Sequence, residues 1–222
     1  MSSYLELADW RRRVAEIYAD WRRDSVTDAA AATLQLRARR TELFRSHSQS
    51  PIPIDERARF GGLSHWPYDP ALRMTAAFES DDAALADPHA EEPAAVGGLG
   101  QIQLPTSGAS PFKFRRVGSV RLSGPLAGTT LPVYWMLGYA GGVFVPFRDA
   151  TSGTETYGAG RYLLDTVKGA DQGVDPASGE LVLDFNLAFH PSCTYDPKWN
   201  CPLAPPESHL SVPVSAGERL PG

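Results

Sequence analysis

The sequence predicts a mainly β fold, an antiparallel β-sandwich or incomplete β-barrel with an N-terminal helical segment and an ordered proline-rich C-terminal strap. Glycine and proline are frequent, at 20 and 19 of 222 residues, as in folds with many turns. Short β-like runs follow one another without long helical stretches, which is typical of antiparallel sandwiches and barrels. Hydrophobic residues make up 42% of the chain, so a normal core is expected and general disorder is excluded.

Residues 1–50 are expected to form a helical segment packed on a β-rich domain of residues 51–222. Apolar residues recur there at spacings of three and four, which lines one face of a helix: Leu7, Trp10, Val14, Ile17 and Trp21. A second helix is expected from Thr27 or Asp28 to near Phe44. The apolar face is expected to pack on the protein's own sheet, and a dimer seam is the alternative.

Seven runs rich in β-branched and aromatic residues are expected to form strands: 72–78, 96–104, 112–122, 130–139, 142–147, 157–166 and 181–189. Gly- and Asp-containing segments at 124–128, 150–153 and 171–179 predict hairpin connections. The acidic segment 81–93 predicts an exposed loop. Six prolines between residues 191 and 213 exclude a central strand or helix there. They predict the strap, with a short strand near 209–214.

Charge and cysteine content limit the partners and the compartment. The net charge of −5 disfavours nucleic-acid binding, since phosphate contacts need a basic surface. The Arg clusters at 11–13 and 37–40 alternate with acids, which predicts solvated helix faces rather than a membrane or nucleic-acid surface. No run approaches the roughly 18 apolar residues of a membrane span, and no signal peptide is visible. We therefore expect a cytoplasmic protein, and the preference for Arg over Lys suggests a GC-rich bacterial genome.

A polar constellation is the first candidate site. Tyr157 and Arg161 share one face of their predicted strand, and Asp184 and Asn186 share one face of theirs. If the two strands are neighbours, Arg161 meets Asp184 or Asp149, since a guanidinium inside a sheet needs a carboxylate or a bound anion. Either an internal ion pair fixes the register, or a pocket presents these groups to a ligand.

The C-terminal segment holds the second candidate site. His190, Cys193 and Cys201 supply three ligands in one loop, and His209 is a conceivable fourth, so a zinc site is one alternative. Their spacing is not that of a standard zinc finger. Two buried thiols are the commonest arrangement for such cysteines. A disulfide is the third alternative, against which the reducing compartment argues.

Several short blocks carry a resemblance to a known family: Thr156-Tyr-Gly-Ala-Gly-Arg-Tyr-Leu163, Leu183-Asp-Phe-Asn186, Pro191-x-Cys193-x-Tyr195, Cys201-Pro-Leu-x-Pro-Pro206 and Ala216-Gly-Glu218. In this order they resemble a bacterial and archaeal domain-of-unknown-function family, over most of residues 40–218. His190 and Ser208 stand where that family usually has Asn, which argues against a metal site that needs His190. The resemblance implies a shared fold and a shared polar site, but no activity.

The function expected from these features is binding of a small polar or anionic molecule. The alternative is an enzyme of the hydrolase or isomerase type, with Asp149 or Asp184 as general base and Arg161 as charge stabiliser. The usual phosphate-binding, dinucleotide-binding and nucleophile motifs are missing from the sequence. Their absence favours binding. The oligomeric state stays open, with a dimer as one possibility.

Overall fold

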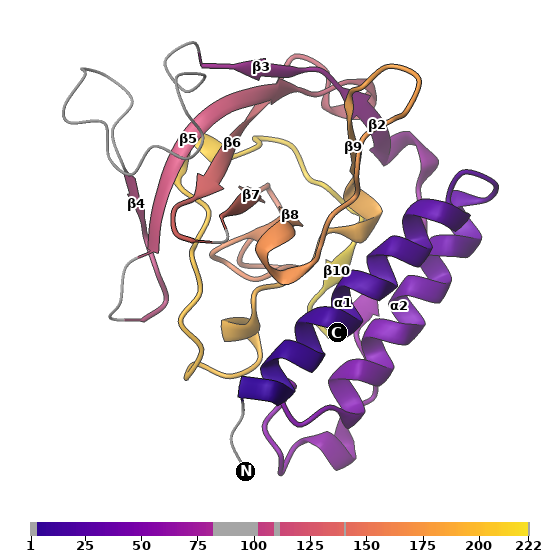
Figure 1. Ribbon diagram of the computed structural model, residues 1–222, viewed down its shortest axis with the longest axis vertical. Coiled ribbons are helices and arrows are strands. Elements are labelled where there is room, and N and C mark those ends of the chain that lie inside the picture. The colour runs from indigo at the N-terminus through magenta and orange to yellow at the C-terminus, as the bar shows by residue number, and fades with distance from the viewer. Residues whose placement is uncertain (1–3, 82–101, 109–111, 140, 222) are drawn as a thin grey trace.

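The computed structural model describes residues 4–81, 102–108, 112–139 and 141–221. The fold is mainly β, as predicted. One six-stranded antiparallel sheet and two sheets of two strands make up the β part, and the strands of the described residues do not close into a barrel. Two helices lie along one side of these layers (Figure 1).

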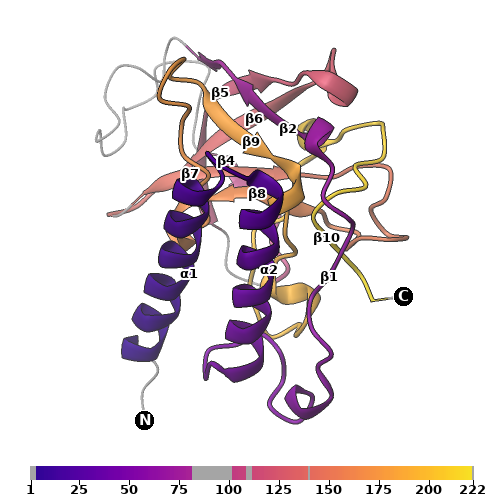
Figure 2. The same cartoon turned by 90° about the vertical axis from the view of Figure 1, so that its right-hand side faces the viewer.

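The helices α1 (Tyr4–Asp24) and α2 (Ala29–Ser46) form a hairpin and lie side by side (Figure 2). The predicted start of the second helix is confirmed, because the Asp28 side chain accepts a hydrogen bond from the backbone N–H of Ala31 at 2.9 Å. The buried face of α1 is the predicted apolar one, and Tyr18 and Trp21 lie deepest in it. This face packs on the sheet in one shared hydrophobic cluster.

The main sheet has the strand order β3-β5-β6-β7-β8, and β4 pairs with the other end of β5 on the same edge as β3. Its strands are β3 (Phe78–Ser80), β4 (Ile102–Leu104), β5 (Phe112–Arg121), β6 (Thr130–Met136), β7 (Gly142–Phe147) and β8 (Arg161–Asp165). The predicted hairpin at 124–128 is confirmed, and Gly124 and Gly128 take its positive φ angles of 55° and 85°. The register of β7 against β8 shifts at Pro146, which lacks the N–H that a regular ladder requires.

Two short pairs complete the β structure: β1 (Ser64–His65) with β10 (Glu218–Arg219), and β2 (Arg73–Ala76) with β9 (Leu181–Asp184). The expectation that segment 171–179 joins two paired strands is wrong, because β9 pairs with β2 and places Asp184 opposite Arg73. The predicted strand 181–189 also ends early. Asp184 caps a 3₁₀ turn, Phe185–Leu187, by accepting a hydrogen bond from the N–H of Asn186.

The other predicted strands agree with the structure apart from their ends. The strand predicted at 157–166 begins only at Arg161, and the run predicted at 72–78 divides into β2 and β3. The predicted strand at 209–214 is wrong: His209 makes a single bridge to Arg148, and the last strand is β10. Residues 82–93 of the expected loop and 96–101 of an expected strand lie outside the described residues.

The proline-rich segment after residue 190 is an ordered strap along β7 and β8. Its backbone is held by hydrogen bonds from the Arg148 N–H to the Ser208 carbonyl (2.9 Å) and from the Leu210 N–H to the Arg148 carbonyl (2.8 Å). Leu210, Val214 and Ala216 fill the second hydrophobic cluster, between the main sheet and the β2–β9 pair. The strap therefore closes the core and brings its own last residues beside β1.

Candidate functional site

Arg161 lies inside the protein, where it fastens the strap to the sheet. Its guanidinium pairs with Asp149 at 2.5 Å and donates to the carbonyls of Val214 (2.8 Å) and Glu218 (3.1 Å). A further hydrogen bond reaches the carbonyl of Ala216. The side chain is 1% exposed. Of the two carboxylates expected to meet Arg161, the structure pairs it with Asp149.

Asp184 and Asn186 form a separate buried group. One oxygen of Asp184 accepts from the backbone and side-chain amides of Asn186 at 2.9 and 2.8 Å, and the other lies 3.6 Å from Nε of Arg73. Asn186 also bonds the backbone N–H and carbonyl of Asp69, each at 2.8 Å. Burial raises the pKa of Asp184. These hydrogen bonds join the turn after β9 to the segment before β2.

Tyr157 belongs to a third group, at the foot of the strap. Its N–H donates to Nε2 of His190 at 3.3 Å, and its hydroxyl accepts from the Cys193 thiol at 3.8 Å. Burial raises the pKa of Tyr157 to about 12. The predicted constellation therefore divides into three groups with different hydrogen-bond partners, which contain Tyr157, Arg161 and the Asp184–Asn186 pair.

The two cysteines lie together as buried free thiols. The N–H of Cys193 donates to the sulfur of Cys201 at 3.4 Å. A hydrogen bond from the Cys201 thiol lowers the pKa of Cys193 to about 6, and the same bond raises the pKa of Cys201. His190 turns to Tyr157 and Glu218 instead. Over the part of the chain that the structure describes, no three His, Cys, Asp or Glu side chains form a metal-binding group.

We expect protein purified without metal affinity resin to contain less than about 0.2 zinc per chain, with two thiols that titrate after unfolding. In the native state Cys193 should react first with a thiol reagent, because thiolates are the reactive form. Elemental analysis and mass spectrometry of the labelled protein provide the measurements. One zinc per chain would contradict this expectation. Fewer than two titratable thiols in protein that has met no added oxidant would contradict it as well.

A buried ionic network around Glu218 links α2, the strap and β10. One oxygen of Glu218 pairs with Arg40 at 2.7 Å, and the other accepts from the N–H of His190 (2.8 Å) and the hydroxyl of Tyr195 (3.0 Å). Burial alone raises the pKa of Glu218, but the attraction of Arg40 and of two histidines outweighs it and lowers the pKa to about 2. Glu218 is therefore ionised over the physiological range of pH.

His65 and His190 are the histidines beside Glu218. Burial lowers the pKa of each to about 4, against the attraction of Glu218 and with the repulsion of Arg40. Both rings are therefore neutral near pH 7. Gly217 allows this close packing: at its φ of 76° a Cβ would lie 2.5 Å from the carbonyl of Ala188.

An open groove of about 730 Å³ lies against this network. We call it the Arg219 groove. It is lined by Ile52, Glu56, Arg59, Phe60, Gly61, Gly62, Leu63, Ser64, His190, Thr194, Tyr195, Arg219, Leu220 and Pro221. The hydroxyl oxygen of Thr194 is buried and has no hydrogen-bond partner among the described atoms. Arg59 and Arg219 supply positive charge to the groove, and neither is in an ion pair with another described residue.

Sequence reasoning missed Arg40, Arg219 and Thr194 as site residues, although Tyr195 and Glu218 lie in the blocks that resemble the family. Arg40 carried a usable signal, because it stands in the apolar stripe of α2 between Leu36 and Leu43. A charged residue at such a position needs a buried partner.

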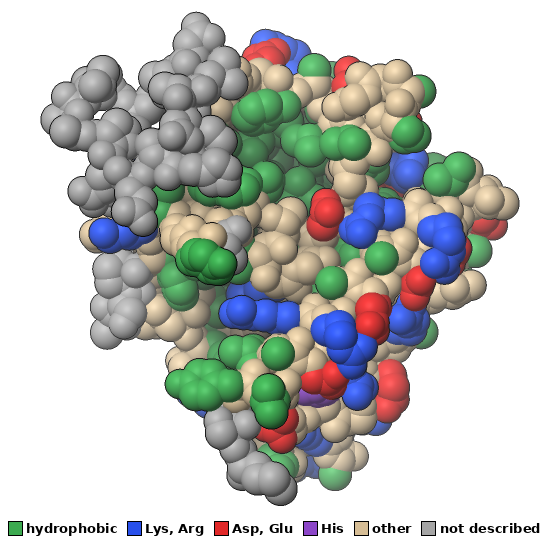
Figure 3. All heavy atoms as spheres, in the orientation of Figure 1, with side chains coloured by type: hydrophobic (Ala, Val, Ile, Leu, Met, Phe, Trp, Pro, Cys, Tyr) green, Lys and Arg blue, Asp and Glu red, His purple; other side chains and the backbone are tan. Residues whose placement is uncertain are grey.

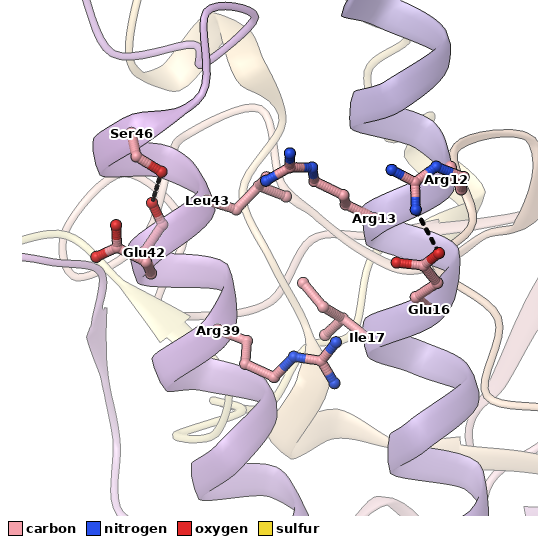
Figure 4. A pocket seen from close by; sticks show the side chains of 8 residues that line it. All are labelled: Arg12, Arg13, Glu16, Ile17, Arg39, Glu42, Leu43 and Ser46. Carbon is pink, nitrogen blue, oxygen red and sulfur yellow. Dashed lines mark hydrogen bonds and ion pairs between the residues drawn. The ribbon is translucent and has the colours of Figure 1, made fainter.

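A second groove, between α1 and α2, has about 360 Å³ and is lined by three arginines (Figure 4). Their charges are already paired with nearby acids. Arg12 and Arg13 share Asp9, Arg12 also bonds Glu16, and Arg39 pairs with Asp20. The helical side of the molecule shows positive and negative side chains interleaved (Figure 3). This pattern matches the predicted solvated helix face for residues 11–13 and Arg39. The prediction is wrong for Arg37 and Arg40, which are buried. Arg37 donates to the carbonyls of Trp66 and Asn186, and Arg40 pairs with Glu218. Within the described residues, no helix combines the length and apolar character needed to span a membrane.

The comparisons with known proteins agree with this fold. The family described as Protein of unknown function (DUF1684) matches residues 58–219. An uncharacterized protein from gene locus rrnAC0354 of Haloarcula marismortui, solved by solution NMR, is 32% identical to this chain, with a TM-score of 0.58. The match covers 89% of this chain and 97% of the archaeal one. No curated protein matches the chain significantly. By the extent of the family match, the chain belongs to the DUF1684 family of proteins of unknown function.

Proposed function

We propose that this protein binds a small anionic molecule in the Arg219 groove. The observation that carries the proposal is the buried hydroxyl of Thr194, which has no hydrogen-bond partner among the described atoms. Thr194 lines the same groove as Arg59 and Arg219, whose guanidinium groups form no ion pair with a described residue. A buried polar atom without a partner is costly, and a bound ligand would satisfy it. Guanidinium groups favour carboxylates and phosphates, which they bind in bidentate geometry.

The size and walls of the groove suit a small molecule. Its volume lies within the range of about 300–1,000 Å³ that is typical of ligand sites. Gly61 has open space where a Cβ would be, so the backbone borders the groove without a side chain in between. The Glu218 network fixes His190 and Tyr195 in the wall. Such a preformed wall lowers the ordering cost of binding.

Arg161 holds the strand that borders this groove. It donates to the carbonyl of Glu218 in β10, the strand that also carries Arg219. In this proposal Arg161 is a positioning residue, since its own charge is used by Asp149. A catalytic role for Asp149 or Asp184 gains no support from the geometry, because both carboxylates are buried and neither lines the Arg219 groove.

The test is a calorimetric titration with glycerol 3-phosphate and citrate as anionic probes and with glycerol as the uncharged control. We expect saturable binding of at least one anion and none of glycerol. Arg219→Gln should weaken binding about fivefold or more, as expected for loss of a charge-assisted hydrogen bond. Thr194→Val should also weaken binding, because it removes the hydroxyl and keeps the shape of the side chain.

Arg121→Gln is the matched control, because Arg121 is an exposed arginine on β5 that pairs with Glu79 and does not line the groove. Absence of binding by both anions, or equal affinities in Arg219→Gln and Arg121→Gln, would refute the proposal. Recovery of the bound probe with unchanged mass distinguishes binding from turnover.

A further inference from the structure

We propose a second ligand site, for a small aromatic acid, in a pocket of about 260 Å³ between the N-terminal half of α1, the main sheet and the strap. We call it the aromatic pocket. Its lining shares no residue with the Arg219 groove. The short turn Ser192–Thr194 separates the two sites, with Ser192 in one lining and Thr194 in the other. The proposal therefore does not depend on the function proposed above.

The sheet supplies an aromatic floor. Phe114 of β5 and Phe144 of β7 lie with ring centroids 5.2 Å apart, and both are almost fully buried. Phe112 and Met136 continue this surface towards the edge of the pocket. Aromatic rings add offset or edge-to-face attraction to simple burial, and the methionine sulfur also favours a ring. An aromatic ligand therefore fits this floor better than an aliphatic chain of the same size.

The side walls add two tryptophans from segments far apart in sequence. Trp10 comes from α1, and Trp199 comes from the strap. Nε1 of Trp199 is buried and has no acceptor among the described atoms. Because an indole N–H only donates, a ligand with an oxygen acceptor would supply the missing partner. This unpaired donor favours a ligand that carries a polar group in addition to its apolar part.

The charges in the lining favour an acidic ligand. Arg11 on α1 lines the pocket and forms no ion pair with any described residue. Nζ of Lys168 lies 3.4 Å from Oδ2 of Asp165. Asp165 is the one acid in the lining and already faces Lys168. Arg11 thus leaves an uncompensated positive charge beside an apolar pocket. Hydrophobic side chains gather on the molecular face beside the N-terminal half of α1, with basic side chains next to them (Figure 3).

The volume limits the size of the ligand. At about 30 Å³ for each water molecule, the aromatic pocket has room for about nine waters. One ring, or two fused rings, with a carboxylate fills such a space, whereas a long acyl chain or a nucleotide does not. The chemistry therefore corresponds to a benzoate-like or naphthoate-like acid.

The probe for the test is 4-fluorobenzoate, observed by ¹⁹F NMR in the presence of the full-length protein. The uncharged control is 4-fluorobenzyl alcohol, which keeps the ring and loses the carboxylate. We expect saturable broadening or shift of the benzoate signal and a clearly weaker effect on the alcohol. Glycerol 3-phosphate should not compete, which separates this site from the Arg219 groove.

Three variants locate the binding. Arg11→Gln should raise the dissociation constant about fivefold, the upper range for one exposed charge. Trp10→Ala should raise it about fivefold or more through the lost ring contact. Arg45→Gln is the matched control, because Arg45 is an exposed helix arginine that does not line the pocket. Thermal melting of each variant confirms that it is folded.

The proposal fails if the wild-type protein does not bind 4-fluorobenzoate saturably, or if it binds the alcohol equally well. It also fails if both Arg11→Gln and Trp10→Ala bind the benzoate as tightly as Arg45→Gln does, since the ligand would then occupy another place. If glycerol 3-phosphate displaces the benzoate, the two ligands share one site and the proposal of a separate aromatic pocket is overturned.

Discussion

Arg161→Ala is expected to lower the free energy of unfolding by about 3–5 kcal/mol, the typical cost of leaving one partner of a buried ion pair alone. Asp149 is buried with Arg161 and would keep a charge without its counterion. The carbonyls of Val214, Ala216 and Glu218 would lose a donor in the same step. Urea denaturation, followed by fluorescence and far-UV circular dichroism, measures the loss.

Two further variants separate the charge of Arg161 from its shape. Arg161→Lys keeps the charge, but an ammonium group cannot reproduce the planar fork that reaches Asp149 and three carbonyls together. It should therefore recover only part of the stability. Arg116→Ala is the control for an exposed arginine, since Arg116 lies 3.5 Å from Asp81 at the surface, and should cost less than about 1 kcal/mol. A loss in Arg161→Ala no larger than in Arg116→Ala would contradict the structural role.

The aromatic rings on Arg161 make the expected loss larger than the ion pair alone suggests. The guanidinium carbon lies 5.0 Å from the ring centroid of Phe147 and 5.3 Å from that of Trp66. Desolvated cation–π contacts of this kind contribute about 1–2 kcal/mol. If Arg161 also positions β10, the variant should weaken anion binding in the Arg219 groove.

Local patterns were sufficient to predict the helices and most strands. The three-and-four spacing of apolar residues marked the buried face of α1, and Asp28 marked the start of α2. Turn residues around Gly124 marked the β5–β6 hairpin. Each of these signals acts over a few residues and is therefore visible in a single sequence.

Strand partners could not be predicted in the same way. Alternation shows that Asp184 and Asn186 share a face, but not that β9 pairs with β2, more than 100 residues earlier. The expected meeting of Arg161 with Asp184 depended on β8 and β9 being neighbours. Asp149 was the other candidate, and it lies just beyond β7, which does pair with β8.

The Glu218 network shows the same limit at longer range. Arg40 and Glu218 are 178 positions apart, and only the path of the strap brings them together. The sequence identified Arg40 as an exception in an apolar stripe without indicating which acid it meets. The groove residues were hidden for the same reason, since they come from the segment 52–64, the segment 190–195 and the C-terminal residues from Arg219 on.

This network should make the fold sensitive to acid. His65 and His190 have pKa values lowered to about 4 from the usual 6.5, so between pH 6.5 and 4 the unfolded chain binds protons that the folded chain does not. Stability is therefore highest above pH 6.5 and falls as the pH is lowered to 4. Over this range, each histidine lowers the free energy of unfolding by up to about 1.4 kcal/mol per pH unit.

Glu218 extends the loss to lower pH. Its pKa of about 2 lies below the usual 4.5, so its contribution to stability is complete above pH 4.5 and disappears as the pH falls towards 2.

His190→Asn should remove about half of the slope of stability against pH between pH 6.5 and 4, because His190 is one of the two histidines beside Glu218. His209→Asn, at an exposed position, is the matched control. Urea denaturation at pH 7.5, 6, 5 and 4 gives the slopes. A stability that stays constant from pH 6.5 to 4, or a slope that His190→Asn leaves unchanged, would show that the buried histidine is not what makes the fold sensitive to acid.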